Sequence, residues 1–340
     1  MKSLHRLSLV GSAISVAALF AAPATPLYAA EFSAAIVYDT GGKFDKSFNE
    51  SAYNGIVKFK KASGVDVKEA IVNNEVQREQ VLRNMAKKGS DIVIANGFSF
   101  TQSMQKVAAE FPKTKFVLID AEVKADNVLS VVFKEHEGSF LVGMAAALSS
   151  KSKKVGYINA MNMPLLNAFE CGYVQGVKYI DPKIEVLSNV IGSTPSSFND
   201  PGRGAEIAKS QFDRGADVVF PVAGPTGLGV FQAAKDAKKL AIGVDSNQNY
   251  IQPGVILTSM IKRIDQAVFD TLTLARANTW KPGLLKMGLK EGGVDWALDQ
   301  HNRALISAEM EKKITQARQQ IIDGKLDVVD FRTKNTCPVH

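Results

Sequence analysis

The 340-residue chain has few of the side chains on which most enzyme centres and metal sites depend. It contains two cysteines, two tryptophans and four histidines. The histidines show no metal-ligand spacing to one another or to a cysteine, and the chain has neither a C-x-x-C pair nor a G-x-S-x-G nucleophile motif. His136, between Glu135 and Glu137, is interpreted as a residue at the start of a helix rather than as a general base. The sequence therefore predicts a protein that is not an enzyme and that uses no metal or cofactor.

Long apolar runs are scarce in the body of the chain. Its apolar runs, such as 91–95, 116–119 and 218–220, have the length of strands and are bounded by polar residues or glycine. A membrane-spanning helix needs about 20 apolar residues. The body of the chain is therefore expected to contain no transmembrane span.

The first thirty residues differ from the rest. Lys2 and Arg6 precede an apolar run from Leu7 to Phe20, and small residues then lead to Ala30. A charged start, an apolar core and a small-residue zone are the layout of a secretory signal peptide. We expect residues 1–30 to be cleaved and the mature protein to be periplasmic. Because this zone lacks cysteine, we expect no lipid anchor.

Concentrated positive charge is also missing. The net charge is +7, of which Lys2 and Arg6 account for two, and the other basic residues are dispersed. We interpret them as solvated helix faces and turns, so the sequence predicts no nucleic-acid partner. The cysteines, Cys171 and Cys337, could pair in an oxidising compartment, but the sequence does not show whether they meet.

Strand and helix patterns alternate along the chain in two series. The first has strands at 33–39, 66–72, 91–96, 115–120 and 127–134 and helices at 48–63, 77–88, 101–111 and 138–149. The second has strands at 154–159, 217–223 and 240–245, helices at 167–180 and 229–238, and a strand–helix pair within 185–215. A strand at 255–261 and helices at 265–278 and 307–323 remain, which suggests that the chain recrosses between lobes. The pattern predicts an α/β protein of two lobes, each with a parallel sheet covered by helices.

Polar or small residues follow several of these strands. They are Asp39, Asn96–Gly97, Asp120, Ala223–Gly224 and Asp245. In open parallel sheets, ligands bind outside the carboxyl ends of the strands. One aspartate after a strand could be a helix cap or a turn residue. Three at corresponding ends favour a polar ligand site.

The stretch from Asp39 to Asn49 joins the first strand to the first helix. Two adjacent glycines at 41 and 42 permit a tight backbone path, and Ser47 is a candidate helix N-cap. Phe48 and Asn49 would then open the helix at the cleft. Phe48 is interpreted as an exposed platform for a flat ligand, and the alternative is a core aromatic residue.

The motif D-x-G-G-x-x-D-K-S-F-N in this stretch resembles the basic membrane protein family of ABC-transporter solute receptors, of which the purine nucleoside receptor is the best-understood type. Further matching segments lie at 116–120, 137–143, 169–172, 198–201, 223–224, 243–248 and 257–262. The resemblance implies a type I periplasmic-binding fold with two Rossmann-like lobes and three crossover segments. We expect an N-terminal lobe of 31–147 plus about 258–281 and a C-terminal lobe of 148–257 plus about 282–340.

The resemblance also implies a ligand and a site. A purine nucleoside, or a purine base, would bind in the cleft and be delivered to permease subunits by a monomeric receptor. Phe48 and Phe198 would sandwich the base, whose edge would bond to Asp39, Asn49 and Asp120; Asp245 and Lys262 would hold the ribose, backed by Gly224, and Phe169 would line the pocket. Stacking of a base on an aromatic ring contributes about 1–3 kcal/mol.

A phosphate and a sugar are the alternatives to this ligand class. The turn at 224–229 is rich in glycine but lacks the Gly-Lys-Ser/Thr of a phosphate-binding loop, so it is interpreted as a turn that lines the cleft. A sugar or furanosyl-signal receptor of the same fold is the alternative function. The sequence leaves open which nucleoside or base binds.

Overall fold

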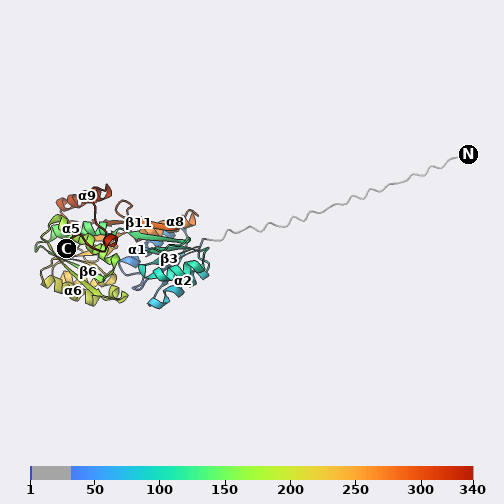
Figure 1. Cartoon of the computed structure of the whole chain (residues 1–340), viewed down its shortest axis with the longest axis horizontal. Helices are drawn as coiled ribbons and strands as arrows, with labels where there is room; N and C mark the ends of the chain where they lie inside the picture. Colours follow the sequence, from blue (N-terminus) through green and yellow to red (C-terminus); the bar gives the residue numbers. More distant parts are fainter. Residues whose placement is uncertain (2–31, 340) are drawn as a thin grey trace. The chain divides into compact units, whose positions relative to one another are not determined.

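The computed structural model of the chain describes residues 32–339, along with Met1, and the signal peptide predicted for residues 1–30 falls outside this range. The described chain from Phe32 contains two six-stranded sheets with helices on both faces. Figure 1 shows the two groups of elements, one containing β3, β11, α1, α2 and α8 and the other containing β6, α5, α6 and α9. We call them the first and the second lobe. They confirm the predicted α/β fold.

The sheet of the first lobe is entirely parallel, in the order β11-β5-β4-β3-β1-β2. Its strands are β1 (Ala34–Tyr38), β2 (Val67–Ile71), β3 (Ile92–Asn96), β4 (Lys115–Ile119), β5 (Val128–Phe133) and β11 (Gly283–Met287). Its helices are α1 (Phe48–Ser63), α2 (Arg78–Lys87), α3 (Thr101–Glu110) and α8 (Ile264–Arg276), with short 3-10 turns η1 (Glu75–Gln77) and η2 (Phe98–Phe100).

The strand β1 shows why both faces of this sheet are covered. All five of its residues are buried. Ala34, Ile36 and Tyr38 pack into a core with α1 and α8, whereas Ala35 and Val37 pack into a core with α2 and α3. Successive strand residues point to opposite faces, so a strand that is apolar throughout requires a helical layer on each side.

The sheet of the second lobe has the order β12-β10-β9-β8-β6-β7, and only β12 runs antiparallel to its neighbour. Its strands are β6 (Lys154–Met161), β7 (Glu185–Gly192), β8 (Val218–Val222), β9 (Leu240–Asp245), β10 (Ile256–Lys262) and β12 (Val294–Trp296). Its helices are α4 (Glu135–Ser149), α5 (Pro164–Ile180), α6 (Pro201–Asp213), α7 (Gly227–Asp236), α9 (Ala308–Ile322) and α10 (Phe331–Lys334), with 3-10 turns η3 (Pro195–Asn199), η4 (Gly224–Thr226) and η5 (Arg303–Leu305).

The chain crosses between the lobes three times, as predicted, but at other residues. The crossings follow β5 near residue 134, β10 at residue 263 and β11 at residues 288–293. The expected boundaries, 147, 258 and 281, differ because α4 packs against α5 and β10 of the second lobe, β10 lies in the second sheet, and β11 joins the first. The strand β11 was not predicted, because it is an edge strand whose residues are mostly exposed and carry no apolar pattern.

Glycines allow the close packing of α4 against α5. A side chain at Gly143 would overlap the carbonyl oxygen of Tyr173, and one at Gly176 would overlap that of Phe140. The two helices also begin three residues earlier than predicted, at Glu135 and at Pro164. Pro164 occupies the first turn of α5, where the missing N–H is not needed.

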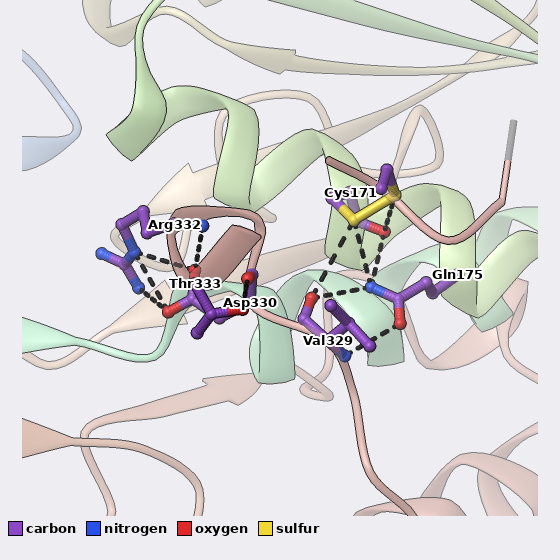
Figure 2. The surroundings of a disulfide bond; sticks show 7 residues. Cys171, Gln175, Val329, Asp330, Arg332 and Thr333 are labelled. Atoms are coloured by element: carbon purple, nitrogen blue, oxygen red, sulfur yellow. Dashed lines mark hydrogen bonds and ion pairs between the residues drawn. A yellow bond between two sulfur atoms is a disulfide. The ribbon is translucent and has the colours of Figure 1, made fainter. Parts of the chain in front are cut away.

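A disulfide joins Cys171 of α5 to Cys337 near the end of the described chain (Figure 2). The sequence left this pairing open. Within the described residues, no helix is long and apolar enough to cross a membrane. In the same part of the chain, no group of three or more His, Cys, Asp or Glu residues is placed to hold a metal ion.

Candidate functional site

A cavity of ≈ 90 Å³ lies between the two lobes, at the carboxyl ends of their central strands. All of the site residues predicted from the sequence line it, namely Asp39, Phe48, Asn49, Asp120, Phe169, Phe198, Gly224, Asp245 and Lys262. Registers such as Tyr38 opposite Asn96 bring the strand ends to one edge of the sheet. The structure therefore gathers in one place residues that are more than 200 positions apart in the sequence, such as Asp39 and Lys262.

The loop before α1 is organised by Asp45 rather than by Ser47. The Asp45 carboxylate accepts the backbone N–H groups of Ser47 (2.9 Å), Asn49 (2.8 Å) and Glu50 (3.0 Å). Ser47 occupies the N-cap position, as predicted, but its side chain makes no cap hydrogen bond. Instead, the Ser47 hydroxyl lies 2.8 Å from Oδ2 of Asp245, across the cleft in the second lobe.

Further hydrogen bonds join the lobes beside this contact. The Ser246 hydroxyl donates to the carbonyl oxygen of Ser47 (2.7 Å), and the Gln248 amide donates to that of Lys46 (3.0 Å). The first strand–helix loop of one lobe is thus tied to the strand end β9 of the other. In this arrangement the lobes are closed over the cavity.

Asn49 and Asp39 line the cavity but are already engaged by the protein. The Asn49 amide donates to the carbonyl oxygens of Asp39 (3.3 Å) and Gly42 (3.1 Å), and its oxygen accepts from the Asn96 amide (3.0 Å). Oδ1 of Asp39 accepts from Nε (3.2 Å) and Nη2 (2.8 Å) of Arg78. Sequence reasoning missed Arg78, because the first residue of α2 belongs to no recognisable motif.

The most buried charges of the cavity surround Lys262. Its side chain is 2% exposed, and its ammonium nitrogen lies 2.5 Å from Oδ2 of Asp120 and 3.3 Å from Oε1 of Glu135. Burial alone would lower the pKa of Lys262, but the carboxylates of Asp120, Glu135 and Asp245 together raise it. Lys262 is therefore a fixed positive charge at the floor of the cavity.

Three aromatic rings enclose the same ammonium group. Its nitrogen lies 5.3 Å from the ring centre of Phe48, 5.1 Å from that of Phe133 and 5.5 Å from that of Phe169. A cation within about 6 Å of a ring face is attracted by the ring quadrupole. Phe48 is half-buried, packs against the core and lines the cavity, so it combines features of both interpretations of the sequence.

Asp120 and Asp245 hold equivalent places in the two lobes. Each directly follows or ends a central strand, and each has a left-handed backbone, with φ of 71° and 65°. Non-glycine residues in this conformation are strained and concentrate at functional sites. Burial raises the pKa of both carboxyl groups, to about 6 for Asp245, against the opposing effect of Lys262. Oδ1 of Asp120 is buried and has no hydrogen-bond partner among the described residues.

An aromatic residue that sequence reasoning missed faces Phe198. The rings of Phe98, from η2 of the first lobe, and Phe198, from η3 of the second, have centres 6.4 Å apart and are tilted by 51°. The predicted sandwich pairs Phe198 with Phe48, which also lines the cavity. Phe98 follows a strand end, at Asn96–Gly97, and this position was the available signal.

Comparison with known proteins identifies a matching family and relatives of this chain. The Bmp family, described as ABC transporter substrate-binding protein PnrA-like, matches residues 32–330. The ABC transporter nucleoside-binding protein BmpA of Lactococcus lactis is 32% identical and aligns over 88% of this chain and 89% of its own length. An uncharacterised lipoprotein of Pyrococcus abyssi is 33% identical over 81% of this chain and 71% of its own.

A solved structure supports the same family assignment. The solute-binding protein of an ABC transporter system from Aeropyrum pernix superposes with a TM-score of 0.81, at 28% identity, over 88% of this chain and 93% of that protein. Proteins of this kind are extracellular receptors that bind a small molecule and interact with a permease. The match to the Bmp family covers nearly all of the described residues. The alignments with the two relatives cover most of each relative's own length. The chain is a member of the Bmp family of PnrA-like ABC transporter substrate-binding proteins.

Proposed function

We propose that the protein binds a purine nucleoside, or a purine base, in the cavity between its lobes and delivers it to the permease of an ABC importer. The observation that carries this proposal is a cavity that combines aromatic rings from both lobes with a buried carboxylate, one oxygen of which has no hydrogen-bond partner in the described part of the chain. Phe48 and Phe98 come from the first lobe, and Phe198 comes from the second. A purine is apolar on its faces and polar at its edge, which suits such a cavity.

Different residues would contact different parts of the ligand. Phe48 or Phe98 would stack on one face of the base and Phe198 on the other, while Phe169 would line the pocket. Oδ1 of Asp120, which lacks a partner among the described residues, would accept an N–H from the base edge. Charge-assisted hydrogen bonds of this kind are stronger than neutral ones.

The sugar would lie toward the second lobe. Asp245 and Lys262 would hold the ribose hydroxyls, with Gly224 behind them. Asp39 and Asn49 would contact the base edge from the first lobe, and their contacts with Arg78 and Asn96 would orient them. Because groups from both lobes contact one ligand, binding would stabilise the closed arrangement over the open one.

The receptor would be a monomer that diffuses in the periplasm. The lipoprotein name of the Pyrococcus abyssi relative points to a membrane anchor in that protein. Here the two cysteines of the chain, Cys171 and Cys337, are both used in the disulfide of the folded part. A cysteine held in a disulfide carries no lipid, which supports the proposal of a receptor that is not lipid-anchored.

The ligand class can be tested directly. Protein is purified fresh, denatured, and its released small molecules are identified by mass spectrometry. Stripped protein is then titrated calorimetrically with inosine, guanosine and adenosine, with hypoxanthine and guanine, and with D-ribose and L-arabinose. The proposal expects a purine in the released fraction and binding of at least one nucleoside or base. Binding of a sugar alone would refute it in favour of the sugar receptor.

A substitution locates the site. Phe198→Ala removes one stacking face and is expected to weaken purine binding by about 1–3 kcal/mol, which is roughly ten- to a hundredfold. Phe198→Tyr keeps the ring and should retain most of the affinity. Equal affinity of the Ala and Tyr variants for the purine would place the ligand elsewhere.

A further inference from the structure

A row of buried and half-buried charges leads from the cavity to the C-terminal segment. Lys262, at the cavity floor, contacts Oε1 of Glu135 at 3.3 Å. Oε2 of Glu135 lies 2.9 Å from Nη1 of Arg332, on the short helix α10. Arg332 in turn contacts both carboxylate oxygens of Asp330, through Nε (2.9 Å) and Nη2 (2.8 Å). Two ion pairs, Lys262–Glu135 and Glu135–Arg332, thus connect the cavity to the C-terminal segment.

Glu135 depends on Arg332 because of its burial. Its side chain is 0% exposed, and a buried charge is costly unless it is paired. Lys262 is shared between Glu135 and Asp120, and its contact with Asp120 is the shorter one. Without Arg332, Glu135 would draw Lys262 away from Asp120. This change alters the charge that faces the ligand.

Arg332 also contacts one of the three aromatic residues around the Lys262 ammonium group. Its Nη2 donates to the carbonyl oxygen of Phe133 at 3.0 Å, and the Phe133 ring lies 5.1 Å from the Lys262 nitrogen. Phe133 and Glu135 flank the first crossing between the lobes. One guanidinium group therefore contacts both the backbone of Phe133 and the carboxylate of Glu135, two residues that lie beside the Lys262 nitrogen.

The segment that carries Arg332 is fastened to α5. The Gln175 side chain donates to the carbonyl oxygen of Val329 and accepts from its N–H, each at 2.9 Å, and Figure 2 shows these contacts beside the disulfide of Cys171 and Cys337. The match to the Bmp family ends at residue 330. Arg332 and Cys337 are therefore features of this chain outside the part that matches the family.

We propose that Arg332 is a positioning residue of the cavity, which holds Lys262 in place through Glu135 and Phe133, and that the disulfide keeps the Arg332 segment docked. The charge at the ligand site thereby depends on residues 330–337 and on the oxidation state of one bond. The proposal builds on the proposed function only where its test uses a purine nucleoside. Its first readout needs no ligand.

That readout is the NMR signal of the Lys262 side chain. In protein labelled with ¹³C at lysine Cε, three rings within 5.1–5.5 Å of the nitrogen should shift the Lys262 signal away from those of solvent-exposed lysines, and Lys262→Met assigns it. We expect this signal to move in Arg332→Met. Lys334→Met, an exposed position on the same helix, is the matched control and should leave it in place. An unmoved signal in Arg332→Met overturns the proposal.

Two further experiments separate the parts of the proposal. Reduction of the wild-type disulfide should move the Lys262 signal in the same direction as Arg332→Met, and an unchanged signal overturns the role of the disulfide. Should Arg332→Met not fold, Glu135→Gln is compared with the double variant Glu135→Gln/Arg332→Met. Because Glu135→Gln leaves the contact of Arg332 with Phe133 in place, the Lys262 signals of these two variants should differ. Coinciding signals overturn the part of the proposal that runs through Phe133.

Binding provides the functional readout. With the nucleoside that the wild type binds best, we expect the Kd of Arg332→Met to rise about tenfold and that of Lys334→Met to stay within about twofold. Wild-type affinity in Arg332→Met overturns the proposal. If the wild type binds no purine nucleoside, the proposed function fails, and the Lys262 signal alone decides the role of Arg332.

Discussion

Asp245→Asn is expected to stabilise the ligand-free protein at neutral pH. Asp245 is 8% exposed, and burial raises the pKa of its carboxyl group from the ordinary 3.8 to about 6. Its ionised form is therefore less favourable in the native protein than in the unfolded chain. Asparagine has nearly the same shape, accepts the Ser47 hydroxyl in the same way and tolerates the left-handed backbone at this position.

The size and sign of the effect follow from this pKa. Between about pH 4 and pH 6 the native state holds a proton that the unfolded state has released, so the stability contributed by Asp245 falls as the pH rises through this range. A difference of about two pKa units corresponds to about 3 kcal/mol above pH 6. The free energy of unfolding of Asp245→Asn should exceed that of the wild type by about this amount at pH 7.5, and by only about 1 kcal/mol at pH 4.5.

The measurement is urea unfolding of both proteins at the two pH values. Each protein is first unfolded and refolded to remove ligand, because a bound ligand would stabilise the native state. Asp126→Asn, at an exposed position, serves as the control and should change neither value. If Asp245→Asn is no more stable than the wild type at pH 7.5, or if the gap is the same at pH 4.5, the reasoning about this carboxylate is wrong.

Three other predictions follow from packing and covalent structure. Phe98→Ala should weaken purine binding by about 1–3 kcal/mol in calorimetry, because its ring faces the cavity; unchanged affinity would leave Phe48 as the stacking residue of the first lobe. Gly143→Ala should lower the unfolding free energy by about 1–3 kcal/mol, because its methyl group would overlap a backbone oxygen of α5. Gly202→Ala, which meets no close contact in α6, should be neutral or stabilising by up to about 1 kcal/mol, so a similar loss in both variants contradicts the packing argument. Reduction of the disulfide, which spans 166 residues, should lower stability by up to about 5 kcal/mol in denaturant titrations, and an unchanged midpoint would contradict this.

Local sequence patterns were sufficient to predict most of the fold. The helix α1 begins at Phe48, as predicted, because an apolar strand, a glycine-rich turn and an amphipathic helix follow one another within thirty residues. Two of the four edge strands, β11 and β12, were missed. Edge strands are short and partly exposed, so their side chains need not follow an apolar alternation. The lobe boundaries were misplaced for a related reason, since an apolar strand such as β10 fits either sheet.

The candidate site likewise contains residues that the sequence predicts and residues whose roles it does not. Strand ends and one motif were enough to predict residues that all line the cavity, because parallel strands bring their carboxyl ends to one edge. The roles of Asp45, Arg78 and Phe98 were not predictable in this way. Each depends on how a side chain is directed, and that direction is set by packing rather than by the local pattern.

The sequence by itself determined the order of strands and helices, the edge at which the cavity lies and the residues of its wall, because these depend on periodicity and on short-range spacing. Only the tertiary structure decided which charges meet. Glu135 and Arg332 are 197 positions apart and form an ion pair because folding brings the half-buried Arg332 against the buried Glu135 beside Lys262. The pairing of Cys171 with Cys337 belongs to the same class, since it requires two distant segments to dock on one helix. Burial and pairing of polar groups are properties of the assembled core, and no local stretch of sequence specifies them.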